Sequence, residues 1–346
     1  MTDPSEPPVD DKPAARPQLP GATEWPEAVP TESPRPGLRT FSLEDRRAPG
    51  LYLVGWLATA LGAAFFLPAL LLGAGGLGGL VLGSVLLGPG LVAAAGAQAI
   101  ERRDRTNLAY RGPSPVLLLA ASLPLSILVT LPIVLVDLPI TSPVATLLSV
   151  TATGAIWLIL VAMTVVGPGA LSWHEIALGL SGVPAARIAR DLLFGAAAAV
   201  PVLLVTAVLA SILISLVGVA PEGPIAPPHD GPSLALSLLV AALLAPISEE
   251  LFYRGFATTA WLRSYGPTRA IVQGGLFFAF VHVLTLGGSD FEHATRAALV
   301  AFVARIPVAI ALGWVFVQRR SLVASFGLHA TFNGALVVLS ALVTRI

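Results

Sequence analysis

From residue 50 onward, the chain consists of apolar runs about as long as helices that cross a lipid bilayer. Such a helix needs about 20 apolar residues, because the hydrocarbon core is about 30 Å thick and each residue advances a helix by about 1.5 Å. The ends of the first two runs and of the run 270–287 are the least distinct. The pattern predicts an all-α fold, a polytopic transmembrane helical bundle with about 8–9 spans. The runs are 51–73, 76–100, 116–138, 144–166, 193–217, 234–261, 270–287, 297–318 and 322–344.

The composition supports an integral membrane protein. Charged residues make up 12% of the chain and hydrophobic residues 55%, whereas soluble proteins carry about 25% charged residues. The mean hydropathy is +0.83. A formal net charge of +0 offers no basic face and argues against a nucleic-acid partner. The absence of cysteine excludes disulfides, thiolate metal ligands and a cysteine nucleophile.

Residues 1–49 differ sharply from the rest of the chain, because they are polar and rich in proline. Such a segment buries too little apolar surface to fold, so we expect a disordered N-terminal tail. The tail contains no apolar core of the kind found in signal peptides, and we expect no cleavage there. The next part, 50–167, is predicted to contain the N-terminal transmembrane helices.

The arginines predict the orientation in the membrane. If the N-terminal tail is cytoplasmic, the outer loops and the C-terminus contain only Arg296 and Arg345. Cytoplasmic loops are enriched in basic residues, so the pattern predicts a cytoplasmic N-terminus, an external C-terminus and an odd number of spans. Abundant arginine, alanine and glycine with a single lysine suggest a bacterial plasma membrane. The inner loops would contain Arg46, Arg47, Arg102, Arg103, Arg105, Arg111, Arg187, Arg190, Arg263, Arg269, Arg319 and Arg320.

The longest loop on the predicted inner side, residues 168–191, ends in the sequence VPAARIAR at 183–190. Apolar and basic residues alternate there at near-helical spacing, which predicts a helix lying along the membrane interface. His174 and Glu175 begin like the zinc motif H-E-x-x-H, but Leu178 stands where the second histidine is needed. We interpret them as an interfacial pair.

Glycines at 75, 79 and 83 form a ladder of small residues near the first two spans. Small residues four apart let two helix backbones approach closely within a membrane. We interpret Gly75, Gly79 and Gly83 as helix-packing positions and not as a phosphate-binding loop.

Three motifs place polar residues inside the late apolar runs. They read E-E-L-F-Y-R with Glu249, Glu250 and Arg254, then F-A-F-V-H with His282, then H-A-T-F-N with His329 and Asn333. An ionisable group at the bilayer centre costs about 2.5–3.5 kcal/mol on insertion scales, so such groups generally have a function. Carboxylates, imidazoles and an amide are the groups with which a hydrolase activates water.

The two adjacent glutamates cannot point in one direction, since neighbours on a helix are about 100° apart. Glu250 and Arg254 are four residues apart, and we expect them to form an ion pair. This leaves Glu249 free to face a cavity as a general base. The alternative is a structural ion pair beside one protonated glutamate.

The histidine motifs complete the predicted site. The loop between 234–261 and 270–287 is short, so these runs should form an antiparallel hairpin that brings His282 to the depth of Glu249. His329 and Asn333 lie four apart on one face of the last span. Their N–H groups suit an oxyanion hole, whereas the alternative is a polar contact between helices.

In this order, the motifs E-E-x-x-x-R, F-x-x-x-H and H-x-x-x-N resemble those of the CAAX-protease and bacteriocin-processing family (CPBP, or Abi) of intramembrane proteases. Its eukaryotic relatives are the type II CAAX prenyl endopeptidases. The resemblance covers about 170–340, which makes residues 168–346 a CPBP-type protease core with an interfacial helix and the catalytic transmembrane helices.

The resemblance implies hydrolysis of a peptide bond in a membrane-associated, CAAX-like or bacteriocin-like substrate. Water would be activated between Glu249 and His282, with His329 and Asn333 as oxyanion hole and Glu250 and Arg254 in support. The family has been described both as metalloproteases and as glutamate-dependent proteases. We expect no obligatory cofactor, and the alternative is a zinc ion bound by Glu249, His282 and His329.

Two other functions remain compatible with the sequence. One is a family member without peptidase activity that acts as a membrane scaffold or immunity protein. The other is a proton-coupled transporter with a glutamate–histidine relay, although the chain shows no internal repeat. Arg305 lies mid-span beside Pro307 and is not part of the motifs. It could pair with a carboxylate such as Glu250 or line a water-filled cavity.

Overall fold

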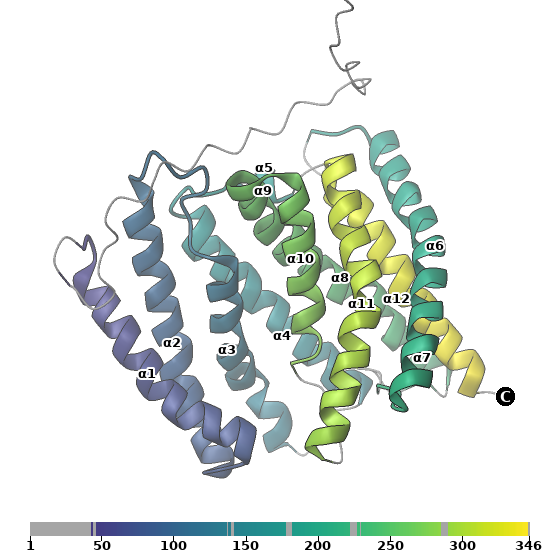
Figure 1. Ribbon diagram of the computed structural model, residues 1–346, viewed down its shortest axis with the longest axis horizontal. Coiled ribbons are helices and arrows are strands. Elements are labelled where there is room, and N and C mark those ends of the chain that lie inside the picture. Colours follow the sequence, from purple (N-terminus) through teal and green to yellow (C-terminus); the bar gives the residue numbers. More distant parts are fainter. Residues whose placement is uncertain are drawn as a thin grey trace, which may run out of the picture.

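The computed structural model is a bundle of helices (Figure 1). It describes residue 43 and residues 46–344, except 137, 140–141, 178–181, 222–226, 229 and 285–289. Nearly all of the predicted disordered tail, 1–49, lies outside the described residues, as do Leu178 and Arg345. All regular elements in the described part are helical. This confirms the predicted all-α fold class.

Eight helices within the described residues are long and apolar enough to cross a membrane. Four precede residue 167: α1 (Pro49–Leu72), α2 (Gly76–Arg103), α3 (Pro115–Leu135), and α4 (Pro143–Val161) with its π-helical end η1 (Ala162–Val166). They are followed by α6 (Ala185–Val217), the composite span Gly231–Tyr265, α11 (Phe291–Arg319) and α12 (Leu322–Thr344). The composite span consists of α7 (Gly231–Leu238), η2 (Leu239–Leu244), α8 (Ala245–Glu249), η3 (Glu250–Thr258) and α9 (Thr259–Tyr265).

The ninth predicted span is too short to cross a membrane as a helix. The run 270–287 contributes to α10 (Pro267–Val281), which has 15 residues and is therefore about 22 Å long. It begins beside the end of α9, on the upper side of Figure 1, and stops before it reaches the lower side, where α11 starts. Run 270–287 is therefore corrected to a short helix that ends inside the bundle.

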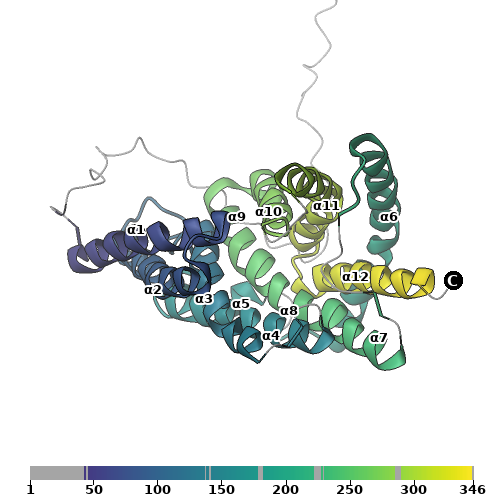
Figure 2. The same ribbon diagram turned by 90° about the horizontal axis from the view of Figure 1, so that it is seen from below.

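Helix α1 lies at one edge of the bundle and α6 at the other (Figures 1 and 2). The start of α1 and the end of α12 lie on opposite sides of the bundle (Figure 1). The twelve arginines predicted for the inner loops all lie at helix ends or loops on the side where α1 begins. Arg296 lies near the start of α11, on the other side. The arrangement is consistent with the predicted orientation, which stays a prediction. The eight candidate spans among the described residues do not match the expected odd number, because α10 is too short to count as a span.

Small residues bring α1 and α2 close together. A Cβ atom at Gly83 would lie 2.5 Å from the backbone nitrogen of Phe66, so no larger residue fits at this crossing. Gly75, in contrast, belongs to the turn between the two helices and has a φ of +76°. The predicted packing role therefore holds for Gly83 but not for Gly75, which lies in the turn and is the N-cap residue of α2.

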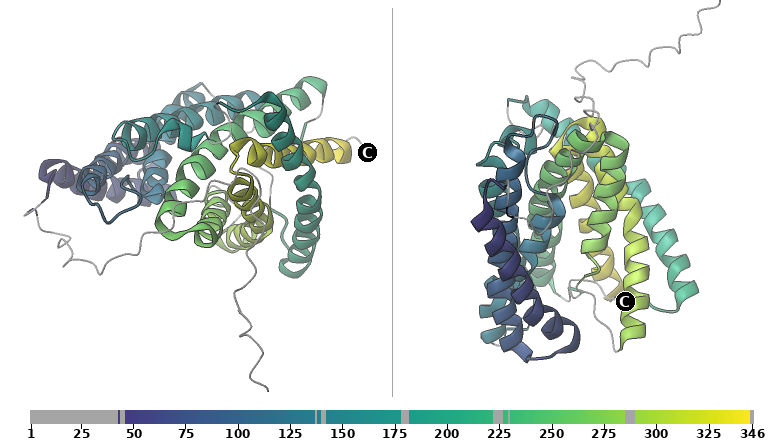
Figure 3. Two further views of the ribbon diagram at one scale, coloured as in Figure 1. Left: turned by 90° about the horizontal axis from the view of Figure 1, so that it is seen from above. Right: turned by 60° about the vertical axis from the view of Figure 1, so that its left-hand side comes forward.

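The segment 168–191 differs from its expected form. Residues 185–190 are the first turns of the transmembrane helix α6, so the alternating apolar and basic residues form no separate interfacial helix among the described residues. The short helix in this segment is α5 (Trp173–Ile176), which begins with a capping box between Ser172 and Glu175. Glu175 also forms an ion pair with Arg263 of α9. Figure 3 shows this side of the bundle from above.

The loop between α2 and α3 is held by a buried tyrosine. Tyr110 Oη donates a hydrogen bond to the carbonyl oxygen of Pro113 at 2.9 Å. Burial raises the pKa of the Tyr110 hydroxyl, so it stays protonated and keeps this donor role. Arg102 closes the same loop by donating to the carbonyl oxygen of Gly112 at 2.9 Å.

The composite span contains two π-helical segments. Thr258 Oγ1 and Thr259 Oγ1 donate to the carbonyl oxygens of Tyr253 and Arg254, each five residues earlier. This spacing fits the wider turn of a π-helix, in which i→i+5 bonds replace the usual i→i+4 bonds. The two adjacent glutamates lie where α8 meets η3. Such segments occur frequently at functional sites, and here they position the most polar part of the bundle.

Candidate active site

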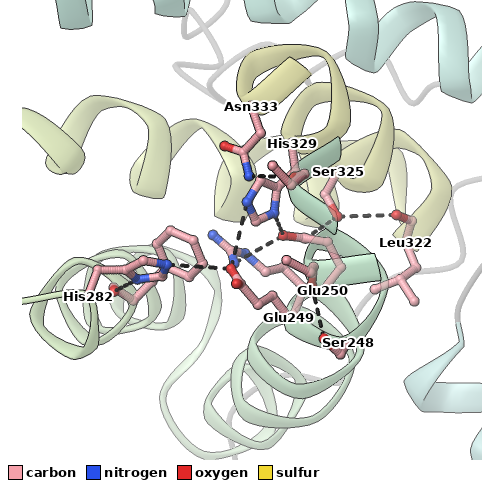
Figure 4. Close-up of polar contacts among 12 residues, drawn as sticks. Ser248, Glu249, Glu250, His282, Leu322, Ser325, His329 and Asn333 are labelled. Atoms are coloured by element: carbon pink, nitrogen blue, oxygen red, sulfur yellow. Dashed lines mark hydrogen bonds and ion pairs between the residues drawn. The ribbon is translucent and has the colours of Figure 1, made fainter. Parts of the chain in front are cut away.

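The predicted polar residues converge from three parts of the bundle (Figure 4). Glu249 and Glu250 lie at the junction of α8 and η3, and His282 caps the C-terminal end of α10. His329 and Asn333 lie on α12 and point toward the glutamates (Figure 4). The antiparallel arrangement of the composite span and α10 thus places His282 at the depth of Glu249, as expected.

Glu250 is the centre of a fully buried network. Its Oε1 lies 3.1 Å from Arg254 Nη1, and both side chains are almost inaccessible, at 1% and 2% exposure. His329 Nδ1 donates to the same oxygen at 2.8 Å, while Ser325 Oγ donates to Oε2 at 2.6 Å. The predicted Glu250–Arg254 contact is therefore present. Ser325 and His329 add to it from α12, so the network joins two spans.

Glu249 faces the two imidazole rings. Its Oε2 lies 3.5 Å from His282 Nε2 and 3.7 Å from His329 Nε2. Both distances exceed those of a direct hydrogen bond, about 2.7–3.2 Å, and Glu249 Oε2 has no hydrogen-bond partner although it is buried. Buried polar atoms are nearly always hydrogen-bonded. The position between these atoms is therefore suited to a water molecule or to a polar group of a ligand.

The hydrogen bonds on the far side of each ring determine what the rings present to Glu249. His282 Nδ1 lies 2.7 Å from the carbonyl oxygen of Phe278, which can only accept, so Nδ1 carries the proton. His329 Nδ1 carries a proton for the same reason, because its partner is the Glu250 carboxylate. In their neutral forms, both rings thus direct an Nε2 lone pair toward Glu249. Three acceptor atoms surround one position, an arrangement that draws protons from a water placed there.

Phe278 forms the apolar wall of the site. Its ring centroid lies 4.3 Å from that of His282 and 5.6 Å from that of His329. The Arg254 guanidinium lies over the same ring, at 4.3 Å from the centroid. The aromatic ring therefore contacts the buried cation and both histidines and limits how these side chains can turn. Its position four residues before His282 is visible in the sequence, but its contact with Arg254 is not.

Asn333 uses one of its N–H groups within the protein. Its Nδ2 donates to the backbone carbonyl oxygen of Ala241, in η2, at 3.0 Å. The second N–H of the amide has no protein partner in the described part. Asn333 thus ties α12 to the composite span and still has one donor for a ligand.

Sequence reasoning missed Ser325 and the carbonyl group of Ala241. Ser325 precedes His329 by four residues, so its place on the same helix face was available from the sequence. Its contact with Glu250 depends on how α12 packs against η3. The acceptor at Ala241 is a backbone carbonyl oxygen, so no residue type in the sequence indicates this contact.

One known protein family matches the part of the chain that contains the site. Residues 231–335 match the family model described as type II CAAX prenyl endopeptidase Rce1-like. This segment is therefore similar to Rce1-like domains. The match begins at α7 and extends through Asn333, so it includes every residue of the site described above. The chain matches no curated protein and no solved structure.

The Rce1-like segment confirms the resemblance on which the family prediction rested, and the family is one of membrane proteases. Together with the eight apolar helices, it supports an integral membrane protease. The bacteriocin-processing branch named in the sequence-based prediction receives no separate support from the match.

A metal ion was the alternative predicted for the Rce1-like site, with Glu249, His282 and His329 as ligands. Within the described residues, no group of three or more histidine, cysteine, aspartate or glutamate side chains is arranged to hold a metal ion. The predicted zinc set of Glu249, His282 and His329 thus finds no support among the described residues.

Arg305, in α11, is the mid-span arginine whose partner the sequence left open. It does not form the ion pair with Glu250 that the sequence left open, since its Nη1 donates to the carbonyl oxygen of Ala301 in its own helix, at 3.1 Å. Arg254 occupies that position beside Glu250 instead. Arg305 therefore has no partner among the glutamates of the site.

Proposed function

We propose that the protein is an intramembrane endopeptidase that hydrolyses a peptide bond of a membrane-associated peptide by water activation at Glu249. The observation that carries the proposal is the position of Glu249 Oε2, which is buried, unpartnered and within 3.7 Å of both Nε2 atoms. The Rce1-like match of the surrounding segment supports the same chemistry.

In the proposed reaction, a water molecule lies between Glu249 Oε2 and His282 Nε2. Glu249 takes a proton as the water oxygen attacks the carbonyl carbon of the scissile peptide bond. The carbonyl oxygen becomes an oxyanion in the tetrahedral intermediate. The proton then passes to the leaving nitrogen, the C–N bond breaks, and the products are a carboxylic acid and an amine. Because His282 Nδ1 is fixed by Phe278, its Nε2 stays directed at the water.

His329 and Asn333 are proposed to stabilise the oxyanion. Asn333 contributes the N–H that Ala241 does not use. His329 donates from Nε2 when its ring is protonated, and the Glu250 carboxylate at Nδ1 stabilises that charge. Preorganised donors of this kind stabilise charge that exists only in the transition state.

Glu250 and Arg254 are proposed to hold the site in its geometry and not to contact the substrate. They lie at 1% and 2% exposure and offer no route to a substrate. Their ion pair holds the Glu250 carboxylate where His329 and Ser325 bind it. Each charge would be costly to bury alone, so the pair keeps this part of the membrane interior both charged and stable.

The site reaches the surface through His282 and Glu249, whose side chains are 27% and 15% exposed. A substrate therefore approaches at the depth of the apolar helices, which favours a peptide that is itself associated with the membrane. A CAAX-like sequence is one candidate, and a bacteriocin-like leader is another.

The test uses purified protein reconstituted into vesicles and a library of lipid-associated peptides, with cleavage followed by mass spectrometry. The parent protein should cleave a subset of the peptides, and Glu249→Gln should lower kcat by about 10²–10⁴-fold. His174→Ala serves as a control, because His174 lies in α5, outside the site. Cleavage by Glu249→Gln at the parent rate would contradict the proposal, as would binding of peptides without any cleavage by the parent protein.

A further inference from the structure

Arg305 lies near the middle of α11, a helix that crosses the bundle. The residues at helical spacing from it, Ala301, Val308 and Ala309, are all buried, at 2%, 4% and 0% exposure. Residues three and four apart share one helix face, so Arg305 is on the face of α11 that packs into the bundle. A charged side chain on this face needs a polar partner, because an intramembrane cation is costly when it is left alone.

Within the described residues, the protein satisfies only part of the hydrogen-bonding capacity of Arg305. One N–H of Arg305 donates to the carbonyl oxygen of Ala301, at 3.1 Å. An arginine has five N–H donors, and no carboxylate of the described residues lies within ion-pair distance of this one. Three other arginines within or at the ends of the spans are paired, since Arg254 contacts Glu250, Arg263 contacts Glu175 and Arg319 contacts Asp191.

The free donors of Arg305 face accessible space. Within the described residues, the buried side-chain nitrogens that lack a hydrogen bond are Nη1 and Nη2 of Arg254. No nitrogen of Arg305 belongs to this group, so the N–H groups of Arg305 that form no hydrogen bond are not enclosed. Its neighbours Phe302 and Ile306 pack against the core cluster that contains Phe278. Helix α11 also packs against α10 and η3, which carry His282 and Glu250. The guanidinium thus lies on the side of α11 that borders the candidate active site.

No ion pair joins Arg305 to Glu249 among the described contacts, although α11 packs against the helices that form the candidate active site. A cation and a carboxylate that border one site but do not touch leave room for a ligand between them. The ligand group that suits a guanidinium is an anion with paired oxygens, above all a carboxylate. Lipid phosphates lie at the membrane surfaces, whereas Arg305 lies near the middle of a span.

From this geometry we infer that Arg305 binds a carboxylate of the substrate while the scissile bond lies at Glu249. The inference rests on the proposed function, and it adds that the enzyme selects peptides by a negative charge near the cleavage point. In a peptide, the carboxylate is either the free C-terminus or the side chain of an aspartate or glutamate. Arg305 is therefore a specificity-determining residue, and it takes no part in water activation.

The experiment measures peptide binding with the Glu249→Gln variant, so that affinity is recorded without turnover. The probes are one acylated apolar peptide as free acid, its C-terminal amide, and versions of each in which an internal glutamate is replaced by glutamine. The affinity should fall about 10–100-fold when the recognised carboxylate is neutralised, as expected for a charge-assisted hydrogen bond. The amide arm identifies the C-terminus, and the glutamine arm identifies the side chain.

The same series is then measured with Arg305→Gln added, where the difference between charged and neutral peptides should vanish. Arg305→Lys should retain part of the difference. Arg296→Gln is the control, since Arg296 lies on the same helix but is exposed and paired with Glu292. Arg305→Met, compared by melting temperature, separates misfolding from lost recognition.

Two results would overturn the inference: equal affinity for charged and neutral peptides in the Arg305-containing protein, or a preference that persists in Arg305→Gln. Either result leaves the proposed function intact if the parent protein still cleaves peptides in a Glu249-dependent way. Conversely, an Arg305-dependent preference without any cleavage by the parent would support the binding site and contradict the protease assignment.

Discussion

His329 Nδ1 donates to Glu250 Oε1 at 2.8 Å, and the opposite nitrogen of the same ring points toward the neighbouring glutamate. One carboxylate thus fixes the ring that faces the other. The two adjacent glutamates therefore have separate environments: Glu250 is enclosed and hydrogen-bonded at both oxygens, whereas Oε2 of Glu249 is buried without a hydrogen-bond partner in the protein. A single imidazole between them transmits any change at Glu250 to the site at Glu249.

This relationship makes Ser325 a positioning residue. Ser325→Ala removes the 2.6 Å hydrogen bond to Glu250 Oε2 and leaves that oxygen buried without a donor. We expect a loss of about 1–3 kcal/mol of stability and a lower kcat with little change in KM, because the His329 ring loses part of its support. Steady-state kinetics and thermal unfolding in detergent measure the two effects. Ser248→Ala is the matched control, since Ser248 bonds only to carbonyl oxygens of its own helix.

His282 should be needed for catalysis but not for folding. It is 27% exposed, and its only hydrogen bond in the described part joins it to Phe278 in the same helix. His282→Ala should therefore lower kcat about 10²–10⁴-fold, as is usual for loss of a group that assists proton transfer, while the melting temperature changes little. Substantial activity in this variant would rule out water activation between His282 and Glu249.

Most of the fold could be predicted from the sequence, because membrane spans are recognised by length and hydropathy alone. Eight of the nine runs became candidate spans. The exception, α10, ends at His282. The sequence stays mostly apolar to Leu286, but apolarity does not indicate where a helix ends. The turn at Gly75 likewise depends on backbone geometry, since a glycine can serve a turn or a helix contact equally well.

Only the contacts of the site that follow from helical spacing could be predicted from the sequence. The spacing of four predicted the contact between Glu250 and Arg254 and the shared face of His329 and Asn333. The second contact of His329, with Glu250, joins residues 79 positions apart and follows from the packing of α12 on η3. The π-helical turns after Glu249 also lay beyond prediction, because they change the direction of side chains without any distinct residue pattern.

The Glu250–Arg254 pair should govern stability. Arg254→Met leaves Glu250 as an uncompensated buried charge, at a cost of about 3–5 kcal/mol. The melting temperature and the yield of folded protein should fall together with activity. In the double variant Glu250→Leu and Arg254→Met, no charge is left alone, and part of the lost stability should return. An Arg254→Met variant as stable as the parent would show that the pair contributes little.

The orientation of the bundle can be tested with single cysteines, because the natural chain has none. Arg105→Cys lies in the loop between α2 and α3, and Phe291→Cys lies at the start of α11, where the side chain is 87% exposed. If the arginine-rich side is cytoplasmic, an impermeant thiol reagent should label the cysteine at position 291 in intact cells and the one at position 105 only after lysis. The reverse pattern would invert the predicted topology.

Substitutions of Asn333 distinguish a catalytic hydrogen-bond donor from a purely structural contact. Its hydrogen bond to the Ala241 carbonyl joins two spans, and losing it should cost about 0.5–1.5 kcal/mol of stability. If the second N–H also binds the oxyanion, Asn333→Ala should lower kcat about 10²–10³-fold while KM stays nearly unchanged, because the oxyanion exists only in the transition state. Asn333→Asp should be as inactive or worse, since a carboxylate would repel both the Ala241 carbonyl and the developing charge. If Asn333→Ala loses stability but retains kcat, the residue serves only to join α12 to the composite span. Full activity in Asn333→Asp would remove it from the oxyanion hole, because no negative charge could be tolerated beside that oxygen.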